Sequence, residues 1–159
     1  MNTVYLLLGS NMGDSEQMLA VATSMIEKNI GKLEKSSSIY RTAAWGKEDQ
    51  PDFLNQIIIV SSSLSSSTVL KELFGIEKEM GRVRTTKNAA RVIDIDMLFF
   101  NDEIIQTETL TVPHPQIQNR KFVLVPLVEI APNFQHPVLK KSSLELLHFC
   151  TDRLNVQKN

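Results

Sequence analysis

The chain has 159 residues, of which 42% are hydrophobic and 22% are charged, a size and composition that predict one compact domain over residues 1–159 and argue against gross disorder. The formal net charge of -1 excludes a strongly basic protein, so we expect neither a nucleic-acid nor a membrane partner, and any anion site must be local. With one cysteine, no membrane-length apolar run and no signal-peptide pattern, the sequence predicts a cytoplasmic protein.

Alternating strands and helices are predicted for the N-terminal part of the chain. An apolar strand, Val4–Leu8, precedes a helix that Asp14 is expected to cap. A strand with imperfect alternation follows at Lys32–Arg41. The next strand, Leu54–Ser62, is rich in β-branched residues, which favour strands.

The following segments complete a known order of elements. Val69–Met80 has a helical apolar face, and Val92–Phe100 predicts another strand. The resulting βαββαβ order predicts an α+β fold of the ferredoxin-like type, an antiparallel sheet with helices on one face. After Asn101 we expect C-terminal additions: a short hairpin, a proline-rich turn, and helices at Asn119–Ile130 and Ser143–Phe149.

Two aspartates alternate at the start of the last predicted strand. Residues two apart in a strand point to the same face, so Asp94 and Asp96 project together, with α-carbons about 6.6 Å apart. The other face, which enters the core, is expected to carry Ile93, Ile95, Met97 and Phe99. Two carboxylates this close repel each other unless a cation lies between them, and hard oxygen ligands favour Mg²⁺. The pair indicates a metal site, although two solvated aspartates on an exposed face have the same spacing.

A basic segment precedes this strand. The ten residues 82–91 contain no acid, and their cations are Arg82, Arg84, Lys87 and Arg91. Such cations pair with phosphates, so a basic loop beside two carboxylates suits a polyphosphate bound together with a metal. A solvated loop or a small RNA-contacting patch is the alternative.

Aromatic residues stand beside polar ones at two places. Phe53 lies close to Asn55, and Phe122 lies close to Arg120. Two phenyl rings can stack on a flat ring while an amide reads its edge, but core packing is the more frequent role of phenylalanine. His114 lies between two prolines, a setting more typical of a structural histidine than of a catalytic one.

Six segments in this order resemble the hydroxymethyl-dihydropterin pyrophosphokinase family, within a stretch that runs from Leu8 to Pro132. None is decisive alone, but six in register are specific. They are Tyr40–Thr42, Gln50–Asn55, Gly81–Arg84, Arg91–Leu98, Leu110–Pro115 and Phe122–Leu127. The resemblance implies a ferredoxin-like fold and transfer of pyrophosphate from ATP to 6-hydroxymethyl-7,8-dihydropterin in folate biosynthesis, with AMP as the other product.

The resemblance also implies roles for individual residues. Asp94 and Asp96 would bind two Mg²⁺ between the substrates, and Arg82 and Arg91 would contact the transferring phosphates. The residues implied for ATP are Leu70, Arg84, Arg91, Met97, Thr111, His114 and Arg120. The residues implied for the pterin are Thr42, Ala43, Trp45, Phe53, Asn55 and Phe122. The expected partners are therefore two small-molecule substrates, and we expect a monomer.

Three places depart from the family pattern. Family members carry Arg-Trp-Gly-Pro-Arg where this chain has Lys87–Arg91, so a stacking tryptophan is replaced by Asn88. Gln116 replaces an arginine, and Trp45 replaces a smaller apolar residue. We therefore expect an active enzyme whose ATP site closes differently or binds more weakly. The alternatives are an inactive pterin- or nucleotide-binding relative and an RNA-binding module that uses residues 82–91.

Overall fold

The computed structural model describes residues 1–43, 51–81 and 92–159. Its elements, in chain order, are β1 (Asn2–Ser10), α1 (Ser15–Asn29), β2 (Lys32–Ser36), β3 (Tyr40–Thr42), β4 (Phe53–Ser62), α2 (Ser66–Glu79), β5 (Asp94–Phe100), β6 (Ile105–Gln106), β7 (Thr111–Val112), the 3-10 helix η1 (Ile117–Asn119), α3 (Lys121–Ile130), α4 (Ser143–Phe149) and β8 (Gln157–Lys158). With β2 and β3 taken together, the first seven elements follow the predicted βαββαβ order, which confirms the ferredoxin-like α+β fold. None of the helices in the described ranges is long and apolar enough to cross a membrane.

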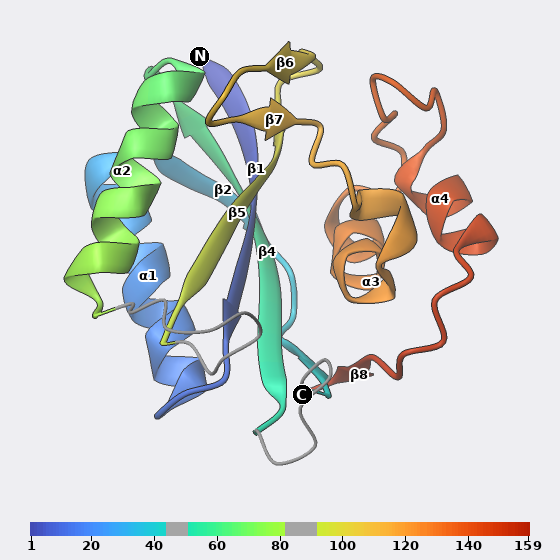
Figure 1. The fold of residues 1–159 in the computed structure, drawn as a ribbon, viewed down its shortest axis with the longest axis horizontal. Helices are drawn as coiled ribbons and strands as arrows, with labels where there is room; N and C mark the ends of the chain where they lie inside the picture. The colour runs from blue at the N-terminus through green and yellow to red at the C-terminus, as the bar shows by residue number, and fades with distance from the viewer. Residues whose placement is uncertain (44–50, 82–91) are drawn as a thin grey trace.

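The main sheet is antiparallel and is covered on both faces. Its strand order is β5-β1-β4-β3-β8, with β2 also paired to β4, and β6 and β7 form a separate hairpin. Helices α1 and α2 lie on one side of the sheet, and α3 and α4 lie on the other (Figure 1). The sequence predicted helices on one face only. Helices α3 and α4, which belong to the C-terminal additions, cover the second face of the sheet. This explains why β1 is buried from Val4 onwards.

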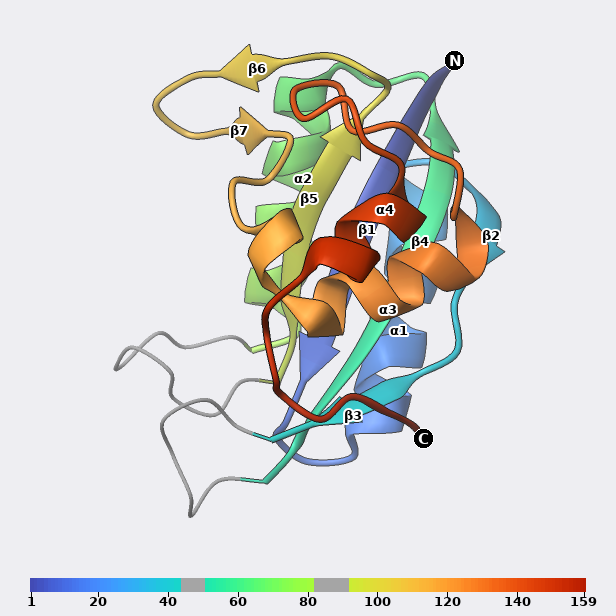
Figure 2. The same cartoon turned by 90° about the vertical axis from the view of Figure 1, so that its right-hand side faces the viewer.

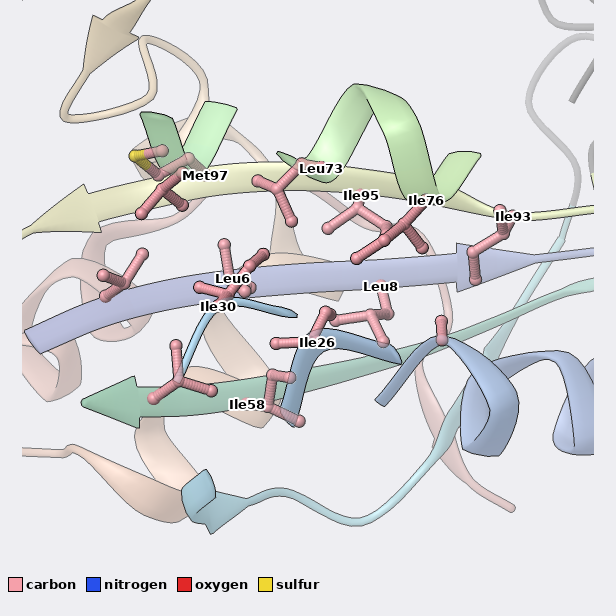
Figure 3. Packing of buried hydrophobic residues seen from close by; sticks show 14 of the residues in the cluster. Leu6, Leu8, Ile26, Ile30, Ile58, Leu73, Ile76, Ile93, Ile95 and Met97 are labelled. Atoms are coloured by element: carbon pink, nitrogen blue, oxygen red, sulfur yellow. The ribbon is translucent and has the colours of Figure 1, made fainter. Parts of the chain in front are cut away.

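Each face of the sheet has its own hydrophobic core. Leu6, Leu8 and Ile58 point towards α1 and α2, and Figure 3 shows them packed with Ile26 and Leu73. The opposite core includes residues of the sheet and of the C-terminal helices, which lie across the sheet in Figure 2. Its fully or nearly fully buried members are Tyr5, Leu7, Ile57, Ile59, Leu98, Phe99, Ile117, Val123, Leu124, Leu127 and Leu146. Alternate residues of β1 therefore enter different cores, as strand geometry requires.

The structure corrects the predicted orientation of Phe99. The pairing between β1 and β5 shifts register, because Tyr5 pairs with Phe99 whereas Leu6 pairs with Met97. Leu98 is the extra residue of this β-bulge, which inserts one residue into a strand and reverses the facing of those beyond it. Ile93, Ile95 and Met97 enter the α1–α2 core as predicted, but Phe99 enters the opposite core.

The predicted strand at residues 32–41 is also corrected, because it forms two short strands. The Ser37 hydroxyl accepts a hydrogen bond from the backbone N–H of Ile57 at 3.0 Å, a position that a strand carbonyl would otherwise occupy. The ladder to β4 is interrupted there and resumes at Tyr40. The predicted cap of α1 is confirmed: Asp14 accepts from the Gln17 N–H at 3.1 Å. Helix α3 begins at Lys121, two residues after its predicted start, since η1 precedes it.

Candidate active site

One face of the sheet changes from apolar to polar along β1. Tyr5 and Leu7 enter the core under α3 and α4, and the next residue on that face is Gly9. Gly9 pairs with Asn55 of β4 on one side and with Asp94 of β5 on the other. The antiparallel register therefore sets a polar row across three neighbouring strands, directly after the apolar part of the same face.

Glycine at position 9 makes room for the Asn55 side chain. A Cβ at this position would lie 3.1 Å from Asn55 Oδ1, closer than ordinary packing allows. Asn55 Nδ2 donates to Thr42 Oγ1 at 3.0 Å, and both side chains are about 4% exposed. The amide is thus held between β1 and β3, which leaves its orientation little freedom.

A cavity of about 400 Å³ lies over this row, and we call it the larger cavity. It is enclosed by strands β1, β3, β4 and β5, by the start of α3 and by the last residues of the chain. The lining residues are Leu7, Gly9, Thr42, Ala43, Phe53, Asn55, Asp94, Asp96, Gln116, Asn119, Arg120, Phe122, Asp152 and Leu154. Among them are five of the six residues that the family resemblance implied for the pterin.

A smaller cavity, of about 230 Å³, lies along the outer strand β5 beside α2. Its lining residues are Leu70, Phe74, Glu77, Asp94, Ile95, Asp96, Met97, Thr109, Leu110, Thr111, His114 and Pro115. Four of the residues implied for ATP lie here: Leu70, Met97, Thr111 and His114. Asp94 and Asp96 line both cavities, so these two residues of β5 form a common wall.

Arg120 and Phe122 stand together at the start of α3. The Arg120 guanidinium carbon lies 5.8 Å from the centre of the Phe122 ring, within the range of a cation–π contact. Arg120, which the resemblance placed with ATP, lines the larger cavity. The Arg120 charge also lowers the pKa of His114, which lines the smaller cavity.

His114 is held as a neutral side chain. Its backbone N–H donates to the Leu98 carbonyl at 2.9 Å, and its Nδ1 accepts from the Gln116 N–H at 3.1 Å. Burial lowers the pKa of His114 below its ordinary value of 6.5, the Arg120 charge lowers it further, and Asp94 opposes them. Since Nδ1 is an acceptor, the proton of the neutral ring is on Nε2, which can donate a hydrogen bond to a ligand.

Two contributions to the site were missed by the sequence analysis. Glu77 is 4% exposed, and its Oε2 accepts from the Ile95 N–H at 2.8 Å, between the two aspartates. Its position on the buried face of α2 is a signal that could have been noticed, because a buried carboxylate needs partners. Asp152 and Leu154 follow the last helix, where no pattern distinguished them.

Several predicted residues lie outside the described part of the chain. They are Trp45, Arg82, Arg84 and Arg91, together with the departure from the family pattern at residues 87–90. Within the described ranges, no group of three or more His, Cys, Asp or Glu side chains could hold a metal. The donor set there is the pair Asp94 and Asp96, two hard oxygen ligands on one face of β5.

Comparison with known proteins identifies the family that this chain resembles. Residues 5–132 match the family model described as 7,8-dihydro-6-hydroxymethylpterin-pyrophosphokinase (HPPK). A 2-amino-4-hydroxy-6-hydroxymethyldihydropteridine pyrophosphokinase of Aquifex aeolicus is 43% identical over 141 residues, which cover 89% of this chain and 88% of that protein. The Folic acid synthesis protein FOL1 of Dictyostelium discoideum is 39% identical over 98% of this chain, which corresponds to 22% of its own length.

A solved structure matches the fold at lower sequence identity. The wild-type HPPK-DHPS protein of Plasmodium falciparum with pteroate superposes with a TM-score of 0.75 at 18% identity. The match covers 92% of this chain and 42% of that one, so the chain spans less than half of the larger protein.

Proposed function

The chain belongs to the 7,8-dihydro-6-hydroxymethylpterin-pyrophosphokinase family and is therefore an ATP-dependent pyrophosphokinase of folate biosynthesis, and we propose that the two cavities divided by Asp94 and Asp96 are its substrate sites. The reaction transfers pyrophosphate from ATP to 6-hydroxymethyl-7,8-dihydropterin. The observation that carries the assignment is the shared wall, because a group transferred between two molecules must pass between their binding sites.

The larger cavity is assigned to the pterin. Phe53 on β4 and Phe122 on α3 supply aromatic faces for a flat bicyclic ring, and ring stacking favours such a geometry. The Asn55 amide, fixed by Thr42, supplies a donor and an acceptor for the edge of the ring. Binding there sets the hydroxymethyl group near the carboxylate wall.

The smaller cavity, with the surface around it, is assigned to the nucleotide. Leu70 and Met97 offer apolar contacts, and the Nε2–H of neutral His114 offers a donor to a phosphate or ribose oxygen. Arg120, which lines the larger cavity, adds positive charge to the site. Arg82, Arg84 and Arg91 are assigned to the phosphates on the family resemblance alone.

The donor chemistry of Asp94 and Asp96 fits Mg²⁺. This ion is bound by one or two carboxylates with substrate phosphates and water as the other ligands, so two aspartates suffice where a polyphosphate is also present. We assign two Mg²⁺ to the pair, as the family resemblance implies. Bound there, the ions would neutralise negative charge on the phosphates during transfer.

The residues of the chain act mainly by positioning. The hydroxymethyl oxygen forms a bond to the β-phosphorus of ATP while the bond from that phosphorus to the α,β-bridging oxygen breaks. AMP leaves with that oxygen, and the hydroxyl proton is released to water. Stacking by Phe53 and Phe122 and hydrogen bonding by Asn55 hold the attacking oxygen in line, which can supply much of the rate enhancement. A monomeric active form stays a prediction from the sequence. Cytoplasmic location stays a prediction from the sequence.

The identity of the nucleotide product tests the proposal. Purified protein is incubated with ATP, Mg²⁺ and 6-hydroxymethyl-7,8-dihydropterin, and the products are separated by chromatography. We expect AMP that depends on the pterin, no AMP from Asp96→Ala, and normal AMP from Asp102→Ala, an exposed aspartate just beyond β5. Formation of ADP would contradict pyrophosphate transfer, and pterin binding without turnover would support the inactive relative instead.

A further inference from the structure

The last nine residues, Thr151–Asn159, form a segment that runs from the end of α4 past the start of α3 to the edge of β3 (Figures 1 and 2). We name it the C-terminal segment. It lies beyond residues 5–132, the range that matches the family model.

Its first anchor is at the start of α3. Asp152 Oδ2 accepts from the Lys121 N–H at 3.0 Å, and Asp152 Oδ1 accepts from the Leu154 N–H at 3.0 Å. The first N–H groups of a helix lack partners within the helix, and a carboxylate there is favoured by the helix dipole. Asp152 thus ties the C-terminal segment to the helical turn that presents Phe122.

Its second anchor is at the edge of the sheet. β8 pairs with β3, with Tyr40 opposite Lys158 and Arg41 opposite Gln157. The backbone N–H of Asn159 donates to the Ile39 carbonyl at 2.8 Å. The Asn159 side chain accepts from Arg41 Nη2 at 2.9 Å and donates to Glu16 of α1 at 2.6 Å.

The first part of the C-terminal segment faces the larger cavity. Asp152 and Leu154 line it, along with Thr42 of β3 and Phe122 of α3. The two anchors are therefore on the two elements that stand on either side of the cavity. Leu154 is only half-buried, so part of its apolar surface is available to a ligand.

We propose that the C-terminal segment is a wall of the pterin site, in which Leu154 packs against the pterin and helps to select it, and Asp152 is a positioning residue for Phe122. The proposal rests on the proposed function, because it takes the larger cavity as the pterin site. An aliphatic side chain in contact with a ring discriminates by volume, and each methylene group lost or added in such a contact changes binding about tenfold or more. Asp152 acts through α3, by holding the Phe122 ring at the separation from Phe53 that a stacked ring needs.

The control for Leu154 is Val156, a half-buried aliphatic residue of the same segment. Val156 is not one of the lining residues given above for the larger cavity. Michaelis constants for the pterin and for ATP are measured for Leu154→Ala and Val156→Ala, with thermal melting to confirm that both are folded. Leu154→Ala removes more than one methylene-sized group from a half-buried contact, so we expect a pterin KM raised at least about tenfold and an ATP KM changed by less than about twofold. For Val156→Ala we expect both constants to stay within about twofold of the wild type.

Asp152 is tested by comparison of Asp152→Asn with Asp152→Ala. The asparagine keeps one acceptor oxygen and the alanine keeps none, so we expect the pterin KM to rise in the order wild type, Asn, Ala, with the ATP KM little changed. Equal pterin constants for the wild type and Leu154→Ala, in an enzyme that forms AMP, would overturn this inference and leave the proposed function intact. A wild-type protein that neither forms AMP nor binds the pterin would overturn both.

Discussion

The side chains on the two faces of the central sheet have different roles. The face under α1 and α2 supplies a hydrophobic core, with Leu6 and Leu8 of β1 both fully buried. The face under α3 and α4 is apolar at Tyr5 and Leu7, and then becomes the polar row that contains Gly9. In β1, Leu6 and Leu8 therefore contribute to stability alone. Tyr5 and Leu7 on the other face contribute to stability, and Gly9 on that face belongs to the site.

Mutations on the two faces of the sheet should therefore have different effects, and the face is set by the alternation of residues along a strand. Changes on the α1–α2 face remove buried apolar contacts and should alter the free energy of unfolding. Changes at the polar end of the opposite face should alter substrate binding and turnover in a protein that remains folded. Four substitutions, taken in order of decreasing effect, test this division.

The strongest test is Asp94→Asn, which keeps the size of the side chain and removes its charge. We expect AMP formation to fall about a thousandfold, as when a group that stabilises charge in a transition state is removed. The melting temperature should change little, because asparagine keeps the size of the side chain and Asp94 lies at the polar end of the sheet face. A large loss of stability together with the activity would show that this end of the sheet face is structural as well.

The reverse effect is expected for Leu6→Ala, in the α1–α2 core. Removal of a fully buried leucine should lower the free energy of unfolding by about 3 kcal/mol, from the lost contacts and the cavity that remains. Denaturant unfolding measures the change. Under conditions where the variant is folded, both Michaelis constants should match those of the wild type, and a rise in either one would break the division between the faces.

Gly9→Ala tests the boundary between the apolar and polar parts of the second face. The added methyl group would lie 3.1 Å from Asn55 Oδ1 and must displace an amide that Thr42 holds in place. Overpacking of this kind costs about 1–3 kcal/mol, so we expect the pterin KM to rise about tenfold. Steady-state kinetics with each substrate varied in turn would show whether the ATP KM stays constant, as the assignment of the cavities requires.

The smallest effect concerns Glu129, which ties α3 to the edge of the sheet. Its carboxylate accepts from the Tyr40 hydroxyl at 2.7 Å and from Ser38. Burial raises the pKa of Glu129, but these hydrogen bonds outweigh it, so the pKa lies below its ordinary value of 4.5. A lowered carboxyl pKa stabilises the fold above pH 4.5, and this stabilisation is lost as the pH falls through the folded-state value.

The charge-neutral variant Glu129→Gln should therefore differ from the wild type at neutral pH and converge with it in acid. Because Glu129 as a whole residue is exposed and its carboxylate is only partly covered, we expect a difference of no more than about 1 kcal/mol at pH 7. Urea unfolding at a series of pH values measures it. A difference that persists unchanged down to the lowest pH would assign the effect to packing rather than to charge.

The parts that could be predicted from the sequence are those set by local periodicity. The common facing of Asp94 and Asp96 follows from the two-residue repeat of a strand and is confirmed, since both line the same two cavities. The predicted facing of Phe99 was wrong, because the pairing with β1 creates a bulge of one residue that reverses the repeat. The roles of Asp152 and Leu154 depend on contacts with α3 and β3, more than thirty residues away, which no local pattern encodes.

The common wall formed by Asp94 and Asp96 has a thermodynamic consequence. Charge placed against these carboxylates from one cavity alters the electrostatic potential in the other, so the two ligands are linked. Linkage is reciprocal: the factor by which the nucleotide changes the affinity for the pterin must equal the factor by which the pterin changes the affinity for the nucleotide. The affinity of a competitor for either cavity is therefore defined only when the occupancy of the other is stated.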